Sequence, residues 1–369
     1  MKIKKILLSL LLILSVSSLM AQEPQVAEEG RAAETEGAID AGAVIVGHVA
    51  DAHSWHMFDF EANGKEHSVA IPLPIILFNE GHLDMFWSSR FEHGHADYKG
   101  YRLTGGHGEK EVIICVDEAG NPTGVTPIDI SITKTSAGLI IAVVLLIVLL
   151  MIARNGYKKR GVHAPKGVQS LVELLVVFVR DEIAKPMIGE KKYERYLPYL
   201  LTVFFFIFFC NLLGLIPFFP AGANVTGNIA VTGTLALITF VITQFSGNKH
   251  YWTDIFNPPT VPWWLKVFPL VPLVEFVGVF TKPIVLMIRL FANMTAGHVI
   301  SLGFVSIIFI LSNTFSTAVG GVVTPVSIFF QVFMGALDCL VSYIQAFVFT
   351  TLTALYFGLA VAEPEHDAA

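Results

Sequence analysis

One long stretch without charge constrains this chain more than any other feature of its sequence. Residues 196–248 contain no Asp, Glu, Lys or Arg. A membrane-spanning helix needs about 20 apolar residues, so this stretch can hold two spans and the turn between them. In the whole chain 54% of the residues are hydrophobic and 15% are charged, whereas soluble proteins carry about 25% charged residues. The second half is therefore predicted to be a membrane domain, which excludes an ordinary soluble enzyme.

The first 21 residues have the three parts of a secretory signal. A basic start is followed by an apolar run at 6–16 and then by small residues up to Ala21. Cleavage is expected after Ala21, and an uncleaved anchor is the alternative because Leu19 is large for its position. Residues 22–45 are acidic and poor in large apolar side chains, which predicts a flexible linker.

Residues 46–136 are predicted to form a small β-rich region outside the cytoplasm. Strand-like runs at 69–78, 111–116 and 128–133 are separated by Gly, Asn and Pro. The spacing of the histidines in this region fits no zinc motif, so we interpret them as surface residues, with a metal site as the alternative. They include His48, His53, His56, His93 and His95.

The three cysteines, Cys115, Cys210 and Cys339, suit neither a disulfide framework nor a zinc cluster. Cys210 and Cys339 lie in apolar runs and are predicted to be small buried hydrophobes. Neither a metal nor a cofactor is expected. The net charge of −6 comes without a basic stripe, so nucleic acid is excluded as a partner.

Apolar segments and basic loops together predict five membrane spans. The first, 137–153, is followed by ten Lys and Arg between 154 and 195, which the positive-inside rule assigns to the cytoplasm. Two spans follow at 197–219 and 228–245. The last two apolar stretches, 268–311 and 325–362, are joined by a polar, glycine-containing loop. Each is about twice as long as the bilayer is thick, so it must tilt, kink or run along the interface.

Between the first two spans, residues 165–185 are predicted to form an amphipathic helix at the inner interface, ended by Pro186; a full span is the alternative. Its polar side carries Ser170, Glu173, Arg180 and Asp181. The fold class is thus an all-α polytopic membrane protein with five membrane helices, including a long tilted C-terminal hairpin, a cytoplasmic amphipathic helix and a small β-rich extracytoplasmic region. The N-terminal region is expected outside and the C-terminus in the cytoplasm.

Only four formally charged residues lie between 268 and 362. An ionisable group inside a membrane costs at least about 2.5 kcal/mol, so each is a candidate functional residue. Glu275, Lys282 and Arg289 are seven apart and Asn293 is four further on, which puts all four on one side of a helix. His298 is nine beyond Arg289 and faces the opposite side.

The fourth charged residue, Asp338, begins a polar stripe on the last helix with Ser342 and Gln345. The two helices can therefore present a permanent cation on one surface and a His298–Asp338 proton relay on another. Arginine does not release its proton in a protein, so Arg289 can attract or repel a carboxylate but cannot carry the ion. Ion pairs that only assist packing are the alternative.

The run Thr281-Lys-Pro-Ile-Val-Leu-Met-Ile-Arg-Leu-Phe-Ala-Asn-Met-Thr-Ala-Gly-His298 closely resembles the signature helix of subunit a of the F-type ATP synthase, the membrane stator beside the rotating c-ring. Asn211-Leu-Leu-Gly-Leu-Ile-Pro217 and Gln345-Ala-Phe-Val-Phe fit the same family. The resemblance covers residues 137–362, and the segment 22–135 is longer than the family requires. It implies a subunit in the inner membrane of a bacterium.

The resemblance also implies roles for individual residues. Arg289 would draw the ring carboxylate into its ionised form and block leakage between two offset half-channels, with Gln345 and Asn293 beside it. His298 and Asp338 would line the outer half-channel. The remaining implied channel residues are Glu275 on the cytoplasmic side, Asn211 at a polar position near Gly214, and Thr226 and Asn228 as further lining.

The implied partners are the c-subunit ring, the b-subunit stator stalk, the other ATP synthase subunits and the lipid bilayer. The ion is H⁺ or Na⁺, because in this family the ring site largely selects it. The chain is not catalytic alone, since its sequence has no Walker loop, nucleophile elbow or HExxH motif. Two rival functions are a secondary transporter, which predicts inverted repeats, and a receptor or anchor, which leaves Arg289 unexplained.

Overall fold

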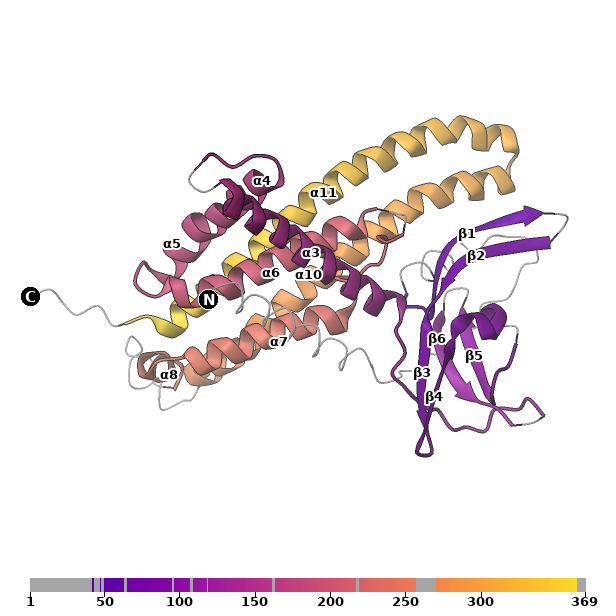
Figure 1. The fold of residues 1–369 in the computed structure, drawn as a ribbon, viewed down its shortest axis with the longest axis horizontal. Helices are drawn as coiled ribbons and strands as arrows, with labels where there is room; N and C mark the ends of the chain where they lie inside the picture. Colours follow the sequence, from indigo (N-terminus) through magenta and orange to yellow (C-terminus); the bar gives the residue numbers. More distant parts are fainter. Residues whose placement is uncertain are drawn as a thin grey trace, which may run out of the picture.

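The computed structural model describes residues 42, 47, 50–62, 65–94, 96–106, 109–117, 119–160, 163–216, 219–256 and 270–363. A β region and a bundle of long helices lie end to end (Figure 1). The predicted signal at 1–21 and nearly all of the predicted linker at 22–45 lie outside the described residues.

Five helices of the described chain are long and apolar enough to cross a membrane, which confirms the predicted number of spans. A short helix, α8 (Lys249–Phe256), follows the third of them. The five are α3 (Lys134–Arg160), α6 (Tyr193–Gly214), α7 (Ile229–Ser246), α10 (Leu270–Thr314) and α11 (Thr317–Val361).

The connection between α10 and α11 is shorter than the sequence suggested. Only two residues separate the helices, and Pro325, expected to begin the last helix, lies inside α11. The Ser316 hydroxyl accepts a hydrogen bond from the Val319 amide at 3.4 Å and caps α11. Gly320 does not form a loop: a Cβ there would lie 2.7 Å from Cβ of Ser312, so the missing side chain lets the two helices meet directly after the turn.

The amphipathic segment has the predicted length but begins and ends three residues later than predicted. It consists of α4 (Val168–Phe178), a π-helical stretch η2 (Val179–Ala184) and α5 (Lys185–Ile188). The prediction that Pro186 ends the helix is wrong. Because the π-helical stretch stops at Ala184, Pro186 lies in the first turn of α5, where proline is tolerated.

One side of this segment packs against the membrane helices. Val179, Ile183 and Ala184 are fully buried, and η2 contacts both α6 and α11. On its polar side, Asp181 accepts hydrogen bonds from Arg180 and is paired with Lys185 at 2.7 Å. The amphipathic character that the sequence predicted is therefore confirmed, and the segment covers the bundle.

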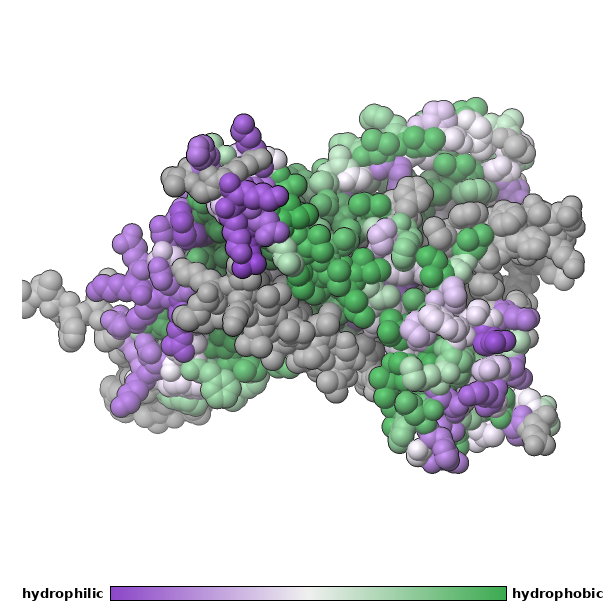
Figure 2. All heavy atoms as spheres, viewed as in Figure 1, coloured by the Kyte–Doolittle hydropathy of each residue, from purple (hydrophilic) through white to green (hydrophobic). Residues whose placement is uncertain are grey.

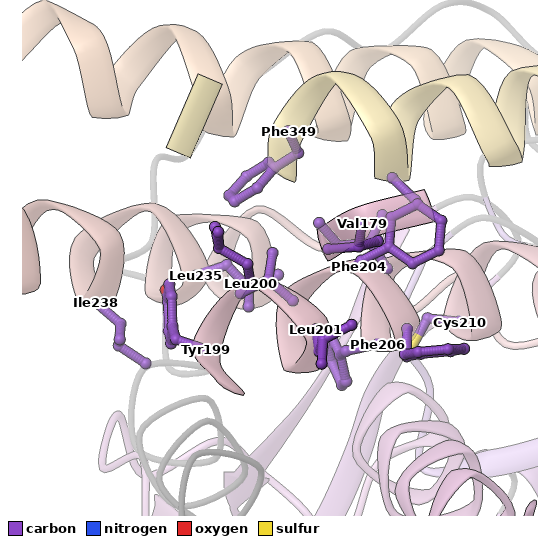
Figure 3. Packing of buried hydrophobic residues seen from close by; sticks show 14 of the residues in the cluster. Val179, Tyr199, Leu200, Leu201, Phe204, Phe206, Cys210, Leu235, Ile238 and Phe349 are labelled. Carbon is purple, nitrogen blue, oxygen red and sulfur yellow. The ribbon is translucent and has the colours of Figure 1, made fainter. Parts of the chain in front are cut away.

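The core of the bundle is built around α6, which contacts α3, α11 and η2. Figure 3 shows Phe349 directed from α11 toward Leu200 on one side of α6, and Phe206 beside Cys210 on the other side. Cys210 belongs to this buried cluster, as predicted. Cys339 is exposed on α11, so its predicted burial is wrong; it lies on the outward side of a helix that is itself at the edge of the bundle.

The described part of the β region contains three antiparallel sheets, with strand orders β1-β2, β4-β3-β7 and β5-β6. The run at 69–78 is two strands, broken at Leu73, and the unexpected strands are β1, β4 and β5. The β3–β4 hairpin turns at Glu80 and Gly81, both with positive φ (47° and 87°), as a tight hairpin requires. The strands are β1 (Ser54–Ala62), β2 (Lys65–Pro72), β3 (Pro74–Asn79), β4 (His82–Trp87), β5 (Tyr101–Gly106), β6 (Glu109–Cys115) and β7 (Ile128–Asp129), with the 3-10 helix η1 (Ser88–Gly94) after β4.

Three contacts attach the β region to the helices. The Asp51 carboxylate accepts a hydrogen bond from the Thr135 amide at 2.9 Å, and the Ala52 carbonyl accepts one from the Lys134 amide at 2.8 Å. The ring of Trp55 packs edge-on against Phe219 at 5.3 Å. The β region is thus held against the first turn of α3 and the connection after α6.

Candidate functional site

Three of the predicted polar residues lie on the outward side of α10. Glu275, Arg289 and Asn293 are all exposed, whereas Leu286 and Leu290 on the other side of the helix are buried in the bundle. These three residues therefore share one side of the helix, as their spacing predicts, and the structure turns that side outward.

Lys282 departs from this arrangement. Its side chain is half-buried, and Nζ lies over the ring of Tyr356 on α11 at 5.7 Å from the ring centre. Tyr356 also lies close enough to Arg289 to interact with it electrostatically. Lys282 is thus turned toward α11 rather than fully outward.

Arg289 is the fixed charge of the outward surface. Within the part of the chain that the structure describes, its guanidinium makes no hydrogen bond or salt bridge. Tyr356 lies close enough to interact with it electrostatically. Because a guanidinium stays protonated in proteins, the outward side of α10 carries a permanent positive charge.

His298 points into the bundle, on the other side of α10 from Arg289. Its Nε2 lies 3.6 Å from the position that a Cβ would take at Gly214 of α6. This nitrogen is buried and has no hydrogen-bond partner among the described residues. The imidazole of His298 therefore lies against α6 at Gly214, at an ordinary van der Waals distance.

A second polar group lies one turn earlier on α6. Asn211 is fully buried, and its Oδ1 accepts a hydrogen bond from Thr226 at 2.6 Å. The Nδ2 atoms of Asn211 and Asn224 are buried and unpaired within the described chain. Asn228 instead caps α7 by accepting a hydrogen bond from the Ala230 amide at 2.9 Å, so its side chain has a local structural role.

Asp338 of α11 reaches α10 at the residue before His298. A Cβ on Gly297 would lie 2.9 Å from Asp338 Oδ1, so the carboxylate packs against bare helix backbone. In the described structure no hydrogen bond joins Asp338 to His298. Asp338 thus contacts α10 at Gly297, the neighbour of His298, but the two predicted relay residues are not hydrogen-bonded to each other in the described structure.

The polar stripe on α11 is confirmed and extends further than predicted. Ser342 and Gln345 are buried, and the Ser342 hydroxyl donates to the Asp338 carbonyl at 2.8 Å. One heptad before Asp338, Gln331 Nε2 donates to Ser301 Oγ on α10 at 2.5 Å. The sequence analysis missed this pair, although the spacing of Gln331, Asp338 and Gln345 contains the signal.

Lys134 was also missed, because the first span was expected to begin three residues later. It opens α3 and lies close enough to His298 to interact with it electrostatically. The start of α3 therefore contributes a charged group near the inward-facing histidine.

His53 of the β region is buried, so its predicted surface position is wrong, whereas His82 is exposed as predicted. His53 is 4% exposed and lies between two carboxylates: Nδ1 is 3.1 Å from Glu111 and Nε2 is 2.8 Å from Asp129. Burial lowers the pKa of His53, but the two carboxylates outweigh it and raise this pKa to about 9. No group of three metal-binding side chains occurs among the described residues; His48 and His95 lie outside them.

Comparisons with known proteins identify the family of the helical part of the chain. Residues 137–358 match the family model described as ATP synthase A chain, and residues 44–130 match a domain of unknown function, DUF8433. ATP synthase subunit a 2 of Chlorobaculum tepidum is 48% identical over 246 residues, which cover 65% of this chain and 66% of the relative.

Two further relatives are similar at greater distance. ATP synthase subunit a of Chloroherpeton thalassium is 43% identical, over 64% of this chain and 69% of the relative. The Myxococcus xanthus protein of the same name is 41% identical, over 65% of this chain and 76% of the relative. The chain therefore belongs to the ATP synthase A chain family, the non-catalytic Fo membrane subunit a of the F-type synthase.

Proposed function

We propose that this chain is the membrane stator of a rotary ATP synthase and provides two offset half-channels that carry protons to and from a c-subunit ring. The observation that carries the proposal is the outward guanidinium of Arg289 on a membrane helix, which has no hydrogen-bond or salt-bridge partner among the described residues. A charge facing lipid is costly, and a carboxylate on a neighbouring subunit would offset that cost. The natural occupant of this surface is a ring of helices that each carry one carboxylate.

Arg289 acts on the passing carboxylate through its permanent charge. A fixed cation in a low-dielectric wall favours the ionised form of a nearby carboxylate. It therefore promotes release of the proton on one side and repels a cation that would otherwise pass directly between the half-channels. Asn293, on the same outward surface, adds a neutral polar group one turn away.

The outer half-channel leads past polar side chains inside the bundle. Its candidates are His298, Asp338 and Asn211, with Gln331 and Ser301 toward the α10–α11 turn. Buried polar atoms are ordinarily paired with protein or water, so the unpaired His298 Nε2 and Asn211 Nδ2 suit a path that exchanges protons. Gln345 continues this stripe toward Arg289 along α11.

The other half-channel opens at the opposite end of α10. Glu275 is exposed there, two heptads before Arg289, and would accept the proton that leaves the ring. In this arrangement the β region faces the outside of a bacterial inner membrane and the C-terminus lies in the cytoplasm. A b-subunit stator stalk and the other synthase subunits would hold the chain in place while the ring turns.

The decisive test replaces Arg289 with Ala in membrane vesicles that contain the whole synthase. ATP-driven proton pumping should fall to background, and passive proton leakage should rise after the catalytic sector is stripped away. Ile288→Ala is the matched control, since Ile288 is the exposed apolar neighbour of Arg289, and it should pump normally. Undiminished pumping by assembled Arg289→Ala enzyme would show that the stator assignment is wrong.

A further inference from the structure

The sheet β4-β3-β7 has a second apolar face that nothing in the described chain covers. Its inner face supplies Ile75 and Leu77, both fully buried, to the small core of the β region. The opposite face is formed by alternate residues of the three strands, and strand β7 is continued by the hydrogen bonds of Ile130 and Ile132 to β3. The residues of this outer sheet face are Pro74, Ile76, Phe78, Leu83, Met85, Trp87, Ile128, Ile130 and Ile132.

All nine residues of the outer sheet face are nonpolar, and six of them are between 40% and 61% exposed. A monomeric soluble domain rarely leaves such a continuous patch in water. A sheet that is apolar on both faces is expected to be covered on both faces. The sequence therefore specifies an occupant for this surface that is not another part of the described chain.

The position of the sheet indicates what that occupant is. Only four residues separate the end of β7 from the start of α3, a distance of at most about 17 Å of extended chain. Asp51, Ala52 and Trp55 fix the β region against α3 and the connection after α6. The sheet is therefore held next to the point where α3 enters the membrane.

The apolar surface also continues onto the membrane helices. An outward stripe on α3 at Ile140, Val144, Val148 and Ile152 begins eight residues after Ile132. Figure 2 shows the β region coloured as hydrophobic on the side nearest the helices and as hydrophilic on the side away from them. The side of the β region that is turned toward the membrane helices is thus its apolar side.

We propose that the outer sheet face rests on the bilayer and inserts into the lipid leaflet at which α3 begins. Its composition fits lipid better than a protein partner: it offers no charged side chain and a single polar atom, the indole N–H of Trp87. Tryptophan is enriched where a membrane meets water, whereas protein interfaces include several hydrogen bonds. The β region would therefore act as an anchor that lies flat on the membrane.

The test measures what a spin label on this face collides with. The full-length chain, with Cys115, Cys210 and Cys339 replaced by Ala, is labelled at Met85→Cys and reconstituted into phosphatidylcholine nanodiscs. Val144→Cys on the exposed stripe of α3 is the lipid reference. Ser89→Cys, exposed in η1 outside the sheet face, is the water reference.

Oxygen concentrates in lipid, and a nickel chelate stays in water. The ratio of oxygen to chelate collisions at position 85 should match the ratio at 144 and exceed that at 89. A ratio like that at position 89 would mean that the outer sheet face is exposed to water. Low collision rates with both reagents would mean that another protein, such as a second copy of the chain, covers this face. Either result would overturn the proposal. Leu83→Cys, on the same face of β4, repeats the measurement should Met85→Cys fail to fold.

Discussion

Asp338 and Gly297 meet where α11 crosses α10: a Cβ at position 297 would lie 2.9 Å from the carboxylate oxygen Oδ1. The glycine gives the carboxylate access to the helix backbone directly before His298. The position of Asp338 in the proposed outer path therefore depends on the lack of a side chain at Gly297.

Gly297→Ala should displace Asp338 and slow proton translocation severalfold. The added methyl group would lie 2.9 Å from Asp338 Oδ1, and the carboxylate must move because the methyl is fixed to the backbone. ATP-driven proton pumping in vesicles measures the effect. Gly303→Ala is the matched control on the same helix, since nothing lies within 4 Å of a Cβ there; equal pumping by both variants would contradict the role of the contact.

The hydrogen bond from Thr226 to Asn211 should stabilise the connection after α6. A double-mutant cycle of Thr226→Val and Asn211→Leu, followed by thermal unfolding in nanodiscs, should give a coupling free energy of about 1 kcal/mol. Thr202 bonds to the Pro198 carbonyl on the same helix, so Thr202→Val combined with Asn211→Leu is the control. Coupling in the control that equals the Thr226 value would refute the assignment.

The stability of the β region should fall as the solution becomes alkaline. The carboxylates of Asp129 and Glu111 raise the pKa of His53 from 6.5 to about 9 in the folded chain. The protonated imidazole therefore stabilises the fold fully below pH 6.5, and this stabilisation is lost as the pH rises through about 9. A shift of this size corresponds to about 3 kcal/mol.

Proteolysis of the β region, measured as a function of temperature at pH 6.5 and pH 10, tests this prediction. The β region should become susceptible to protease at a lower temperature at pH 10. His53→Gln should be less stable at pH 6.5 and should lose most of the pH dependence. An unchanged pH dependence in His53→Gln would assign the titration to another group.

Asp51 should act as the cap of α3 from outside the helix. Its carboxylate accepts a hydrogen bond from the Thr135 amide. This amide lies in the first turn of α3, where backbone amides have no partner within the helix. Asp51→Ala should lower the free energy of unfolding by about 1 kcal/mol, and Asp51→Asn, which keeps an acceptor oxygen, should lower it less. Thermal unfolding of the full-length chain compares the two; equal losses would argue for an effect of charge near Lys134 rather than of capping.

The sequence by itself determined the number of membrane helices and the grouping of Glu275, Arg289 and Asn293 on one side of α10. Lipid cannot satisfy unpaired backbone groups, so apolar length predicts a span, and helical spacing predicts which residues of one helix share a side. The heptad spacing of Asp338 and Gln345 likewise determined a polar stripe within one helix, because residues on one helix keep a constant rotation from one to the next.

Contacts between helices were decided only by the tertiary structure. The relative rotation and axial offset of α10 and α11 place Asp338 against Gly297, Lys282 over Tyr356 and Gln331 beside Ser301. No periodic pattern in the sequence encodes how one helix is rotated and shifted against another. Pro186 continues a helix because a π-helical stretch precedes it. The outer sheet face emerged only once β3, β4 and β7 were paired, because strand register decides which side chains share a surface.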